Sequence, residues 1–197
     1  MSDARREGAR LDATVMFADL SGFTALSERL DPEAATDLVN RCFAALEAIV
    51  LAYGGVVDQY IGDCIKAYWD ADGGGATRAV GAAAAICDVI DRLGEEAGTL
   101  GVHVGLASGP VVAGALGAHQ QVTVVGDTVA VAQSLCETGA RGQVTADRGT
   151  QAEAGSGYTW SAPMPVVIAH RAEPVLAVEL RGAADGGERA AIVAAAA

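Results

Sequence analysis

Two aspartates, Asp19 and Asp63, are the first candidates for chemistry because each lies at the end of an apolar, strand-like run. Residues 14–18 precede Asp19, and Asp63 lies in a Gly62-Asp63 turn between two β-favouring runs. We therefore expect the two carboxylates at neighbouring strand ends, where they could face each other. Such a pair can hold one or two hard divalent cations that bridge to phosphates. Each aspartate also has a structural explanation, Asp19 as a loop cap and Asp63 as a turn residue.

The turn after Asp19 is a second feature with possible chemistry. It reads Leu20-Ser21-Gly22-Phe23-Thr24. A glycine in such a turn lets backbone amides approach an anion at a helix start, which suits a triphosphate. A simple tight turn would explain the glycine equally well.

Apolar periodicity predicts the elements that position these residues. Asp31 and Pro32 form an N-cap followed by proline at the first helical position, and apolar residues then recur at helical spacing up to residue 53. A hairpin follows at 56–61 and 64–69. The next expected elements are a helix at 77–93, a strand at 100–107 that Ser108-Gly109-Pro110 breaks, and a loop or projecting arm at 111–120. The last are a strand at 122–125, a helix at 127–137 capped by Asp127, a small helix at 147–154, and strands at 143–145, 158–161, 166–169 and 175–180.

The order strand, helix, strand, strand, helix, strand indicates an α+β fold with the split βαβ core of ferredoxin-like proteins and added C-terminal strands. We expect a flexible lead at 1–12, one domain at 13–181 and a disordered tail at 182–197. No apolar run approaches the roughly 20 residues of a membrane span, and the charged N-terminus does not resemble a secretory signal. The expected location is therefore cytoplasmic, without a membrane partner.

Charge and cysteine content exclude several kinds of site. The net charge is -12, there is one lysine, and the arginines are scattered, so we expect no nucleic-acid partner. Metal ions and backbone amides would have to carry the charge of any bound nucleotide. The four cysteines are far apart with no C-x-x-C pair, which favours buried free thiols over a zinc site or disulfides.

Three ordered blocks give the chain a family resemblance. They are Phe17-Ala18-Asp19-Leu20-Ser21-Gly22-Phe23-Thr24, Tyr60-Ile61-Gly62-Asp63 and Val125-Gly126-Asp127-Thr128-Val129. Their sequence and spacing resemble the signature blocks of class III adenylyl and guanylyl cyclases, over roughly residues 13–180. The resemblance implies the class III nucleotide cyclase fold.

The resemblance also implies a mechanism. Asp19, Asp63 and the Leu20 carbonyl would ligate two Mg²⁺ or Mn²⁺ ions, and Ser21, Gly22, Phe23 and Thr24 would hold the phosphates of a nucleoside triphosphate. The product would be a 3',5'-cyclic nucleotide, formed by in-line displacement with two metal ions. Members of the family act as head-to-tail dimers with each site built across the interface.

Several family positions differ here. The asparagine that positions the ribose and the arginine that stabilises the transition state correspond to Ala130 and Ser134. The base-selecting positions are Gln59, where adenylyl cyclases usually have lysine, and Thr123. Asp127 of the third block is also expected to bind the substrate. His119 aligns near an arginine that contacts the distal phosphates. His103, His119 and His170 are otherwise expected to be ordinary surface or interface residues.

These departures leave three hypotheses open. In the first, the chain is one half of an enzyme and forms a cyclic nucleotide only with a complementary protomer, because a homodimer would be inactive or weak. In the second, it is a non-catalytic regulatory dimer that binds a nucleotide or metabolite. In the third, the fold serves different chemistry, with Asp19 and Asp63 binding a metal for another phosphorylated substrate or acting as acid and base.

Overall fold

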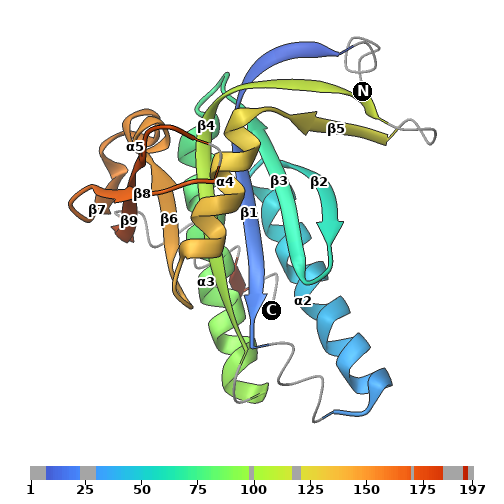
Figure 1. The fold of residues 1–197 in the computed structure, drawn as a ribbon. Coiled ribbons are helices and arrows are strands. Elements are labelled where there is room, and N and C mark those ends of the chain that lie inside the picture. The colour runs from blue at the N-terminus through green and yellow to red at the C-terminus, as the bar shows by residue number, and fades with distance from the viewer. Residues whose placement is uncertain are drawn as a thin grey trace.

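The computed structural model describes residues 8–22, 30–97, 100–116, 121–169, 171–183 and 193–194. These residues form one sheet with helices packed on it (Figure 1). The strands are β1 (Ala9–Ser21), β2 (Val56–Ile61), β3 (Cys64–Asp70), β4 (Gly101–Leu116), β5 (Gln121–Val125), β6 (Val144–Asp147), β7 (Tyr158–Trp160), β8 (Met164–Val166) and β9 (Val175–Ala183). The α-helices are α2 (Pro32–Ala52), α3 (Gly75–Ala97), α4 (Asp127–Thr138) and α5 (Arg148–Ala154).

The sheet has the strand order β2-β3-β1-β4-β6-β9-β7, with β5 paired to β4 and β8 paired to β9. Strand β1 lies between β3 and β4 and is antiparallel to both, whereas β4 and β6 are parallel. The chain order β1-α2-β2-β3-α3-β4 is the predicted strand, helix, strand, strand, helix, strand. The predicted ferredoxin-like split βαβ core with added C-terminal strands is therefore confirmed.

Helices cover both faces of the sheet. Helices α2 and α3 pack on one face, and α4 packs across β1 and β4 on the other (Figure 1). The buried side chains form two separate clusters, one beneath α2 and α3 and one beneath α4. Two stable packing surfaces fix the sheet from both sides, so its strand ends are well-defined places for functional groups.

The alternation of β1 decides where its last polar residue points. Met16, Ala18 and Leu20 belong to the cluster under α2 and α3, whereas Phe17 belongs to the cluster under α4. Because successive side chains of a strand point to opposite faces, Asp19 falls on the α4 face with Phe17. The first aspartate of interest thus lies beside helix α4.

Strand β4 is longer than predicted. Ser108, Gly109 and Pro110 do not break it, and β4 continues into the region expected to be a loop or arm, where it pairs with both β1 and β5. A Cβ at Gly109 would lie 2.9 Å from the Thr128 hydroxyl oxygen, which donates to the Pro110 carbonyl at 3.0 Å. Gly109 therefore allows α4 to pack closely on this strand. In the sequence, the same glycine beside a serine and a proline indicates a strand break.

The domain ends also differ from the expected boundaries. Strand β1 begins at Ala9, because residues 9–12 pair with the extension of β4. Strand β9 runs to Ala183, two residues past the expected end of the domain at 181, and the strand expected at 166–169 is β8 at Met164–Val166. Most of the lead and tail lies outside the described residues. Among the helices of the described chain, none is long and apolar enough to cross a membrane.

Candidate functional site

Asp19 and Asp63 are neighbours in the structure, as their strand positions predict. Asp19 pairs in register with Cys64, the residue after Asp63, and the Leu20 amide donates to the Asp63 carbonyl oxygen at 3.2 Å. The hairpin that carries Asp63 turns at Gly62, which has a φ of +62°. Asp19, at the end of a strand, and Asp63, in the adjoining hairpin turn, therefore lie at the same end of the sheet.

Burial and like charge both act on the Asp19 carboxyl. Its partial burial raises its pKa, the negative charge of Asp63 raises it further, and His103 opposes these effects. A group held in this way is costly to ionise without a nearby positive charge. The Asp19 and Asp63 pair is thus suited to a divalent cation, which supplies that charge.

His103 lies directly against Asp19, although the sequence predicts an ordinary surface or interface histidine. It stands opposite Asp19 in the pairing of β1 with β4, and its Nε2 is 3.0 Å from Asp19 Oδ2. Its Nδ1 is 2.8 Å from the carbonyl oxygen of Cys136, which can only accept, so Nδ1 carries a proton. Both ring nitrogens of His103 therefore have hydrogen-bond partners, Cys136 on one side and Asp19 on the other.

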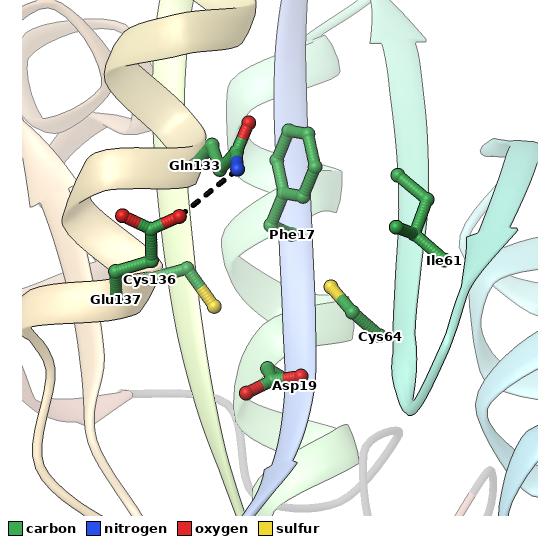
Figure 2. Close-up of a pocket in the computed structure, with 7 residues that line it drawn as sticks. All are labelled: Phe17, Asp19, Ile61, Cys64, Gln133, Cys136 and Glu137. Carbon is green, nitrogen blue, oxygen red and sulfur yellow. Dashed lines mark hydrogen bonds between the residues drawn. The ribbon is translucent and has the colours of Figure 1, made fainter.

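A pocket opens between strand β1 and helix α4, with Asp19 at one end (Figure 2). Its empty volume is about 440 Å³, and its lining residues are Phe17, Asp19, Ile61, Cys64, Gln133, Cys136 and Glu137. Gln133 donates to Glu137 across one turn of α4 at 2.9 Å. The pocket therefore combines an apolar wall with carboxylate and amide groups.

The surroundings of the Cys64 thiol in this pocket disfavour its ionised, reactive form. All four cysteines are free, as predicted, and Cys42, Cys87 and Cys136 are buried. The Cys136 side chain and burial both raise the pKa of the Cys64 thiol. The neutral Cys64 thiol lines the pocket as a small apolar group.

The turn after Asp19 is only partly described. The Ser21 hydroxyl oxygen is buried and has no hydrogen-bond partner among the described residues. Gly22 has a φ of +82°, the left-handed conformation that glycine adopts readily. Phe23 and Thr24, the other predicted phosphate-binding residues, lie outside the described residues, as do His119 and His170.

Thr123 is engaged inside the protein. It is buried, its hydroxyl donates to Asp58 Oδ2 at 2.6 Å, and it accepts from the Lys66 ammonium at 3.1 Å. Lys66 also donates to the Val124 carbonyl at 2.6 Å and lies 2.7 Å from the Asp58 carboxylate. Gln59 stands opposite Lys66 in the pairing of β2 with β3. Thr123 is thus bonded to both members of an ion pair that sequence reasoning missed, and Gln59 lies beside that pair only by strand register.

The outer side of helix α4 holds the remaining predicted residues. Ala130 is exposed and Ser134 half-buried, and their spacing of four places them on one side of the helix. The helix is capped by Gly126, so the prediction that Asp127 caps it is wrong. Asp127 is the first residue inside the helix, and its exposed carboxylate forms an ion pair with Arg171.

Comparison with known proteins identifies the family. A family model described as the adenylate and guanylate cyclase catalytic domain matches residues 8–160. The chain belongs to this cyclase family. It is 30% identical over 133 residues to an adenylate cyclase of Anabaena cylindrica, covering 62% of this chain and 26% of that protein. It is 31% identical over 140 residues to adenylate cyclase 1 of Rhizobium meliloti, covering 66% and 21%. The chain thus spans about a quarter of the curated relatives it matches.

Solved cyclase domains share the fold. The adenylyl cyclase CyaB from P. aeruginosa superimposes with a TM-score of 0.85 at 26% identity, covering 90% of this chain and 97% of that chain. The guanylate cyclase domain of RhGC from Catenaria anguillulae, in complex with GTP, gives a TM-score of 0.80 at 23% identity, covering 89% and 99%. The predicted class III cyclase fold is confirmed.

The residues of this cyclase domain fit the divalent cations that the family implies. Mg²⁺ and Mn²⁺ prefer oxygen ligands, and the site offers the carboxylate of Asp19 from β1 and that of Asp63 from the turn between β2 and β3. The buried hydroxyl of Ser21, two residues after Asp19 on β1, has no hydrogen-bond partner among the described residues. A buried hydroxyl without a protein partner at this end of β1 is expected where a phosphate or a hydrated cation completes its hydrogen bonds.

Proposed function

We propose that this cyclase domain supplies the metal-binding half of a shared active site, and that a partner protomer completes it. The observation that carries the proposal is the meeting of Asp19 and Asp63 at one end of the sheet. The outer side of α4 carries Ala130 and Ser134, which have no charge or amide to offer a substrate. The chain therefore has one set of functional groups and lacks the other.

The ligand in this proposal is a nucleoside triphosphate. The Catenaria anguillulae domain, which shares the fold, was solved with GTP, and this favours a related ligand here. The net charge of -12 disfavours long-range attraction of a triphosphate, so the anion must be recruited as a metal complex. Nothing in the neutral Gln59 and Thr123 pair commits the site to adenine or to guanine.

The site residues of this chain have two roles in the proposed reaction. Asp19 and Asp63 hold the cations, and Ser21 with the turn at Gly22 binds phosphate oxygens. Two cations held by Asp19 and Asp63 would help to ionise the ribose 3'-hydroxyl and would neutralise charge on the triphosphate. The 3'-oxygen then forms a bond to the α-phosphorus, the bond from that phosphorus to the bridging oxygen breaks, and pyrophosphate leaves.

The absence of the partner's functional groups is expected to lower the rate of cyclisation by a homodimer of this chain. Removing one preorganised group that stabilises transition-state charge typically costs on the order of 10² to 10³ in rate. By the family resemblance, Ser134 stands where such a group, an arginine, is expected and Ala130 where an asparagine would position the ribose, and a symmetric dimer would lack both in each of its sites. A homodimer is therefore expected to be a weak cyclase, and a heterodimer with a complementary protomer an efficient one.

Complementation tests this proposal. The chain is mixed with a cyclase domain that keeps its asparagine and arginine but has its two metal-binding aspartates changed to alanine. Cyclic product from ATP or GTP with Mn²⁺, measured by mass spectrometry, should appear only in the mixture and should be lost with Asp19→Ala in this chain. A mixture that forms heterodimers and makes no product would refute the proposal.

A non-catalytic regulatory dimer is the second candidate. The neutral side of α4 at Ala130 and Ser134 favours it, because a surface without catalytic groups can still contact a partner. In this case a nucleotide would bind with Mn²⁺ and be recovered unchanged from both the homodimer and the mixture. Binding without turnover separates the two candidates.

A further inference from the structure

His103 has a fixed position between helix α4 and Asp19. One ring nitrogen, Nδ1, is 2.8 Å from the Cys136 carbonyl oxygen near the C-terminal end of α4, and the other, Nε2, is 3.0 Å from Asp19 Oδ2. The side chain is only 17% exposed. Since both nitrogens have partners, the imidazole has one preferred orientation.

The packing around His103 holds it independently of Asp19. The Cys136 thiol donates to the His103 carbonyl oxygen at 3.3 Å, so strand β4 and helix α4 are joined twice at this residue. Gly139 follows the helix, and a Cβ there would lie only 3.5 Å from the His103 Cβ. The position of the ring is thus set by α4 and β4, and the ring in turn can hold the carboxylate.

The contact with His103 leaves the two carboxylate oxygens of Asp19 in different surroundings. Figure 2 shows its carboxylate between Cys136 of α4 and Cys64 of the β2–β3 hairpin, with one oxygen turned to each side. His103 engages Oδ2, which leaves Oδ1 without a hydrogen bond to the described residues. The hairpin side, which carries Asp63, is where a second carboxylate is available for a shared cation.

We propose that His103 is a positioning residue that engages Oδ2 of Asp19 and thereby presents Oδ1 to a divalent cation shared with Asp63. This inference rests on the metal-binding function proposed above. Hydrogen-bond partners of ligating groups fix the orientation of the ligand, and their replacement typically weakens metal binding about 10–100-fold. His103 fills this place without contacting the cation.

The test compares two replacements of His103. The amide nitrogen of glutamine can stand where Nε2 lies, so His103→Gln keeps a donor to Asp19, whereas His103→Leu keeps the bulk and loses the donor. Both lose the Nδ1 contact with Cys136, so the comparison isolates the Asp19 contact. Mn²⁺ affinity is measured by electron paramagnetic resonance of the free ion, and thermal unfolding checks that each variant is folded.

The expected result is Mn²⁺ affinity at least 10-fold weaker in His103→Leu and within about 3-fold of the wild type in His103→Gln. Unchanged affinity in His103→Leu, or equal losses in the two folded variants, would overturn the inference. Failure of the proposed function has a different signature, because Asp19→Asn would then have no effect on Mn²⁺ binding. In that case nitrogen-15 NMR of the His103 ring still reports its contact with Asp19, as a change in the Nε2 signal in Asp19→Asn.

Discussion

The Lys66 ammonium lies 2.7 Å from the Asp58 carboxylate, and the two side chains are only 4% and 1% exposed. The ammonium has three acceptors, because Thr123 and the Val124 carbonyl complete its hydrogen bonds. This buried pair joins the hairpin of β2 and β3 to β5, which belongs to the arm formed with β4. Removing only one partner of such a buried ion pair strongly destabilises a protein, because the other charge is left buried without compensation.

Removing the lysine alone should therefore destabilise the domain. We expect Lys66→Met to lower the free energy of unfolding by about 3–5 kcal/mol, because it leaves the Asp58 carboxylate buried without a cation. Chemical denaturation measures the change. The double variant Lys66→Met/Asp58→Asn should recover much of the loss, since its amide oxygen still accepts from Thr123. Equal stability of the single variant and the wild type would show that the pair contributes little.

Helix α4 approaches strand β4 at Gly105, and this close packing gives a second prediction. A Cβ at Gly105 would overlap the backbone of Ala132 and Cys136. We expect Gly105→Ala to destabilise the domain by about 1–3 kcal/mol and to weaken Mn²⁺ binding, because α4 must move away from the strand that carries His103. Gly157→Ala is the matched control, since a Cβ there meets nothing within 4 Å. Similar thermal unfolding of the two variants would contradict this account of the packing.

Glu153 gives a prediction about pH. Burial raises its pKa, and the nearby Asp147 and Asp12 raise it further. A carboxyl with a raised pKa in the folded state favours folding at low pH, and this contribution is lost as the pH rises through the folded pKa. Glu153→Gln should therefore stabilise the domain at pH 7, by less than about 0.5 kcal/mol because the site is mostly exposed.

Thermal unfolding at two pH values checks the Glu153 prediction. The gain in Glu153→Gln should be present at pH 7 and absent at pH 3.5, where the wild-type carboxyl is protonated. Glu33→Gln, at another exposed glutamate, provides the comparison, because its charge lies in the first turn of α2 where it favours the helix, so removing that charge should give no gain at pH 7. A gain in Glu153→Gln that is the same at both pH values would mean that its charge is not the cause.

The meeting of Asp19 and Asp63 at one end of the sheet could be predicted from the sequence because it depends on local features. Asp19 ends an apolar strand and Asp63 occupies a glycine turn, so each position follows from periodicity and turn chemistry. The pairing of β1 with β3 then brings them together. The same reasoning gives the split βαβ core, whose helices and strands alternate with clear breaks.

The other contacts depend on register, which periodicity does not specify. His103 meets Asp19 only because β4 pairs with β1 in one of many possible alignments. Asp58 reaches Lys66 and Thr123 beside an irregularity in the pairing of β2 with β3, between Val57 and Gln59. A lysine within an apolar strand was the one visible signal, since a buried ammonium requires a partner.

Restoring the two missing groups tests the central claim without any unidentified partner. Ala130→Asn/Ser134→Arg adds the family's amide and guanidinium to the outer side of α4, away from the core cluster. The measurement is cyclic nucleotide formed from ATP and GTP with Mn²⁺, in the wild type, in this double variant, and in the double variant with Asp19→Asn. We predict a rise of at least about 100-fold in the double variant that Asp19→Asn abolishes. No rise in a folded, dimeric double variant that binds Mn²⁺, or efficient turnover already in the wild type, would contradict the account.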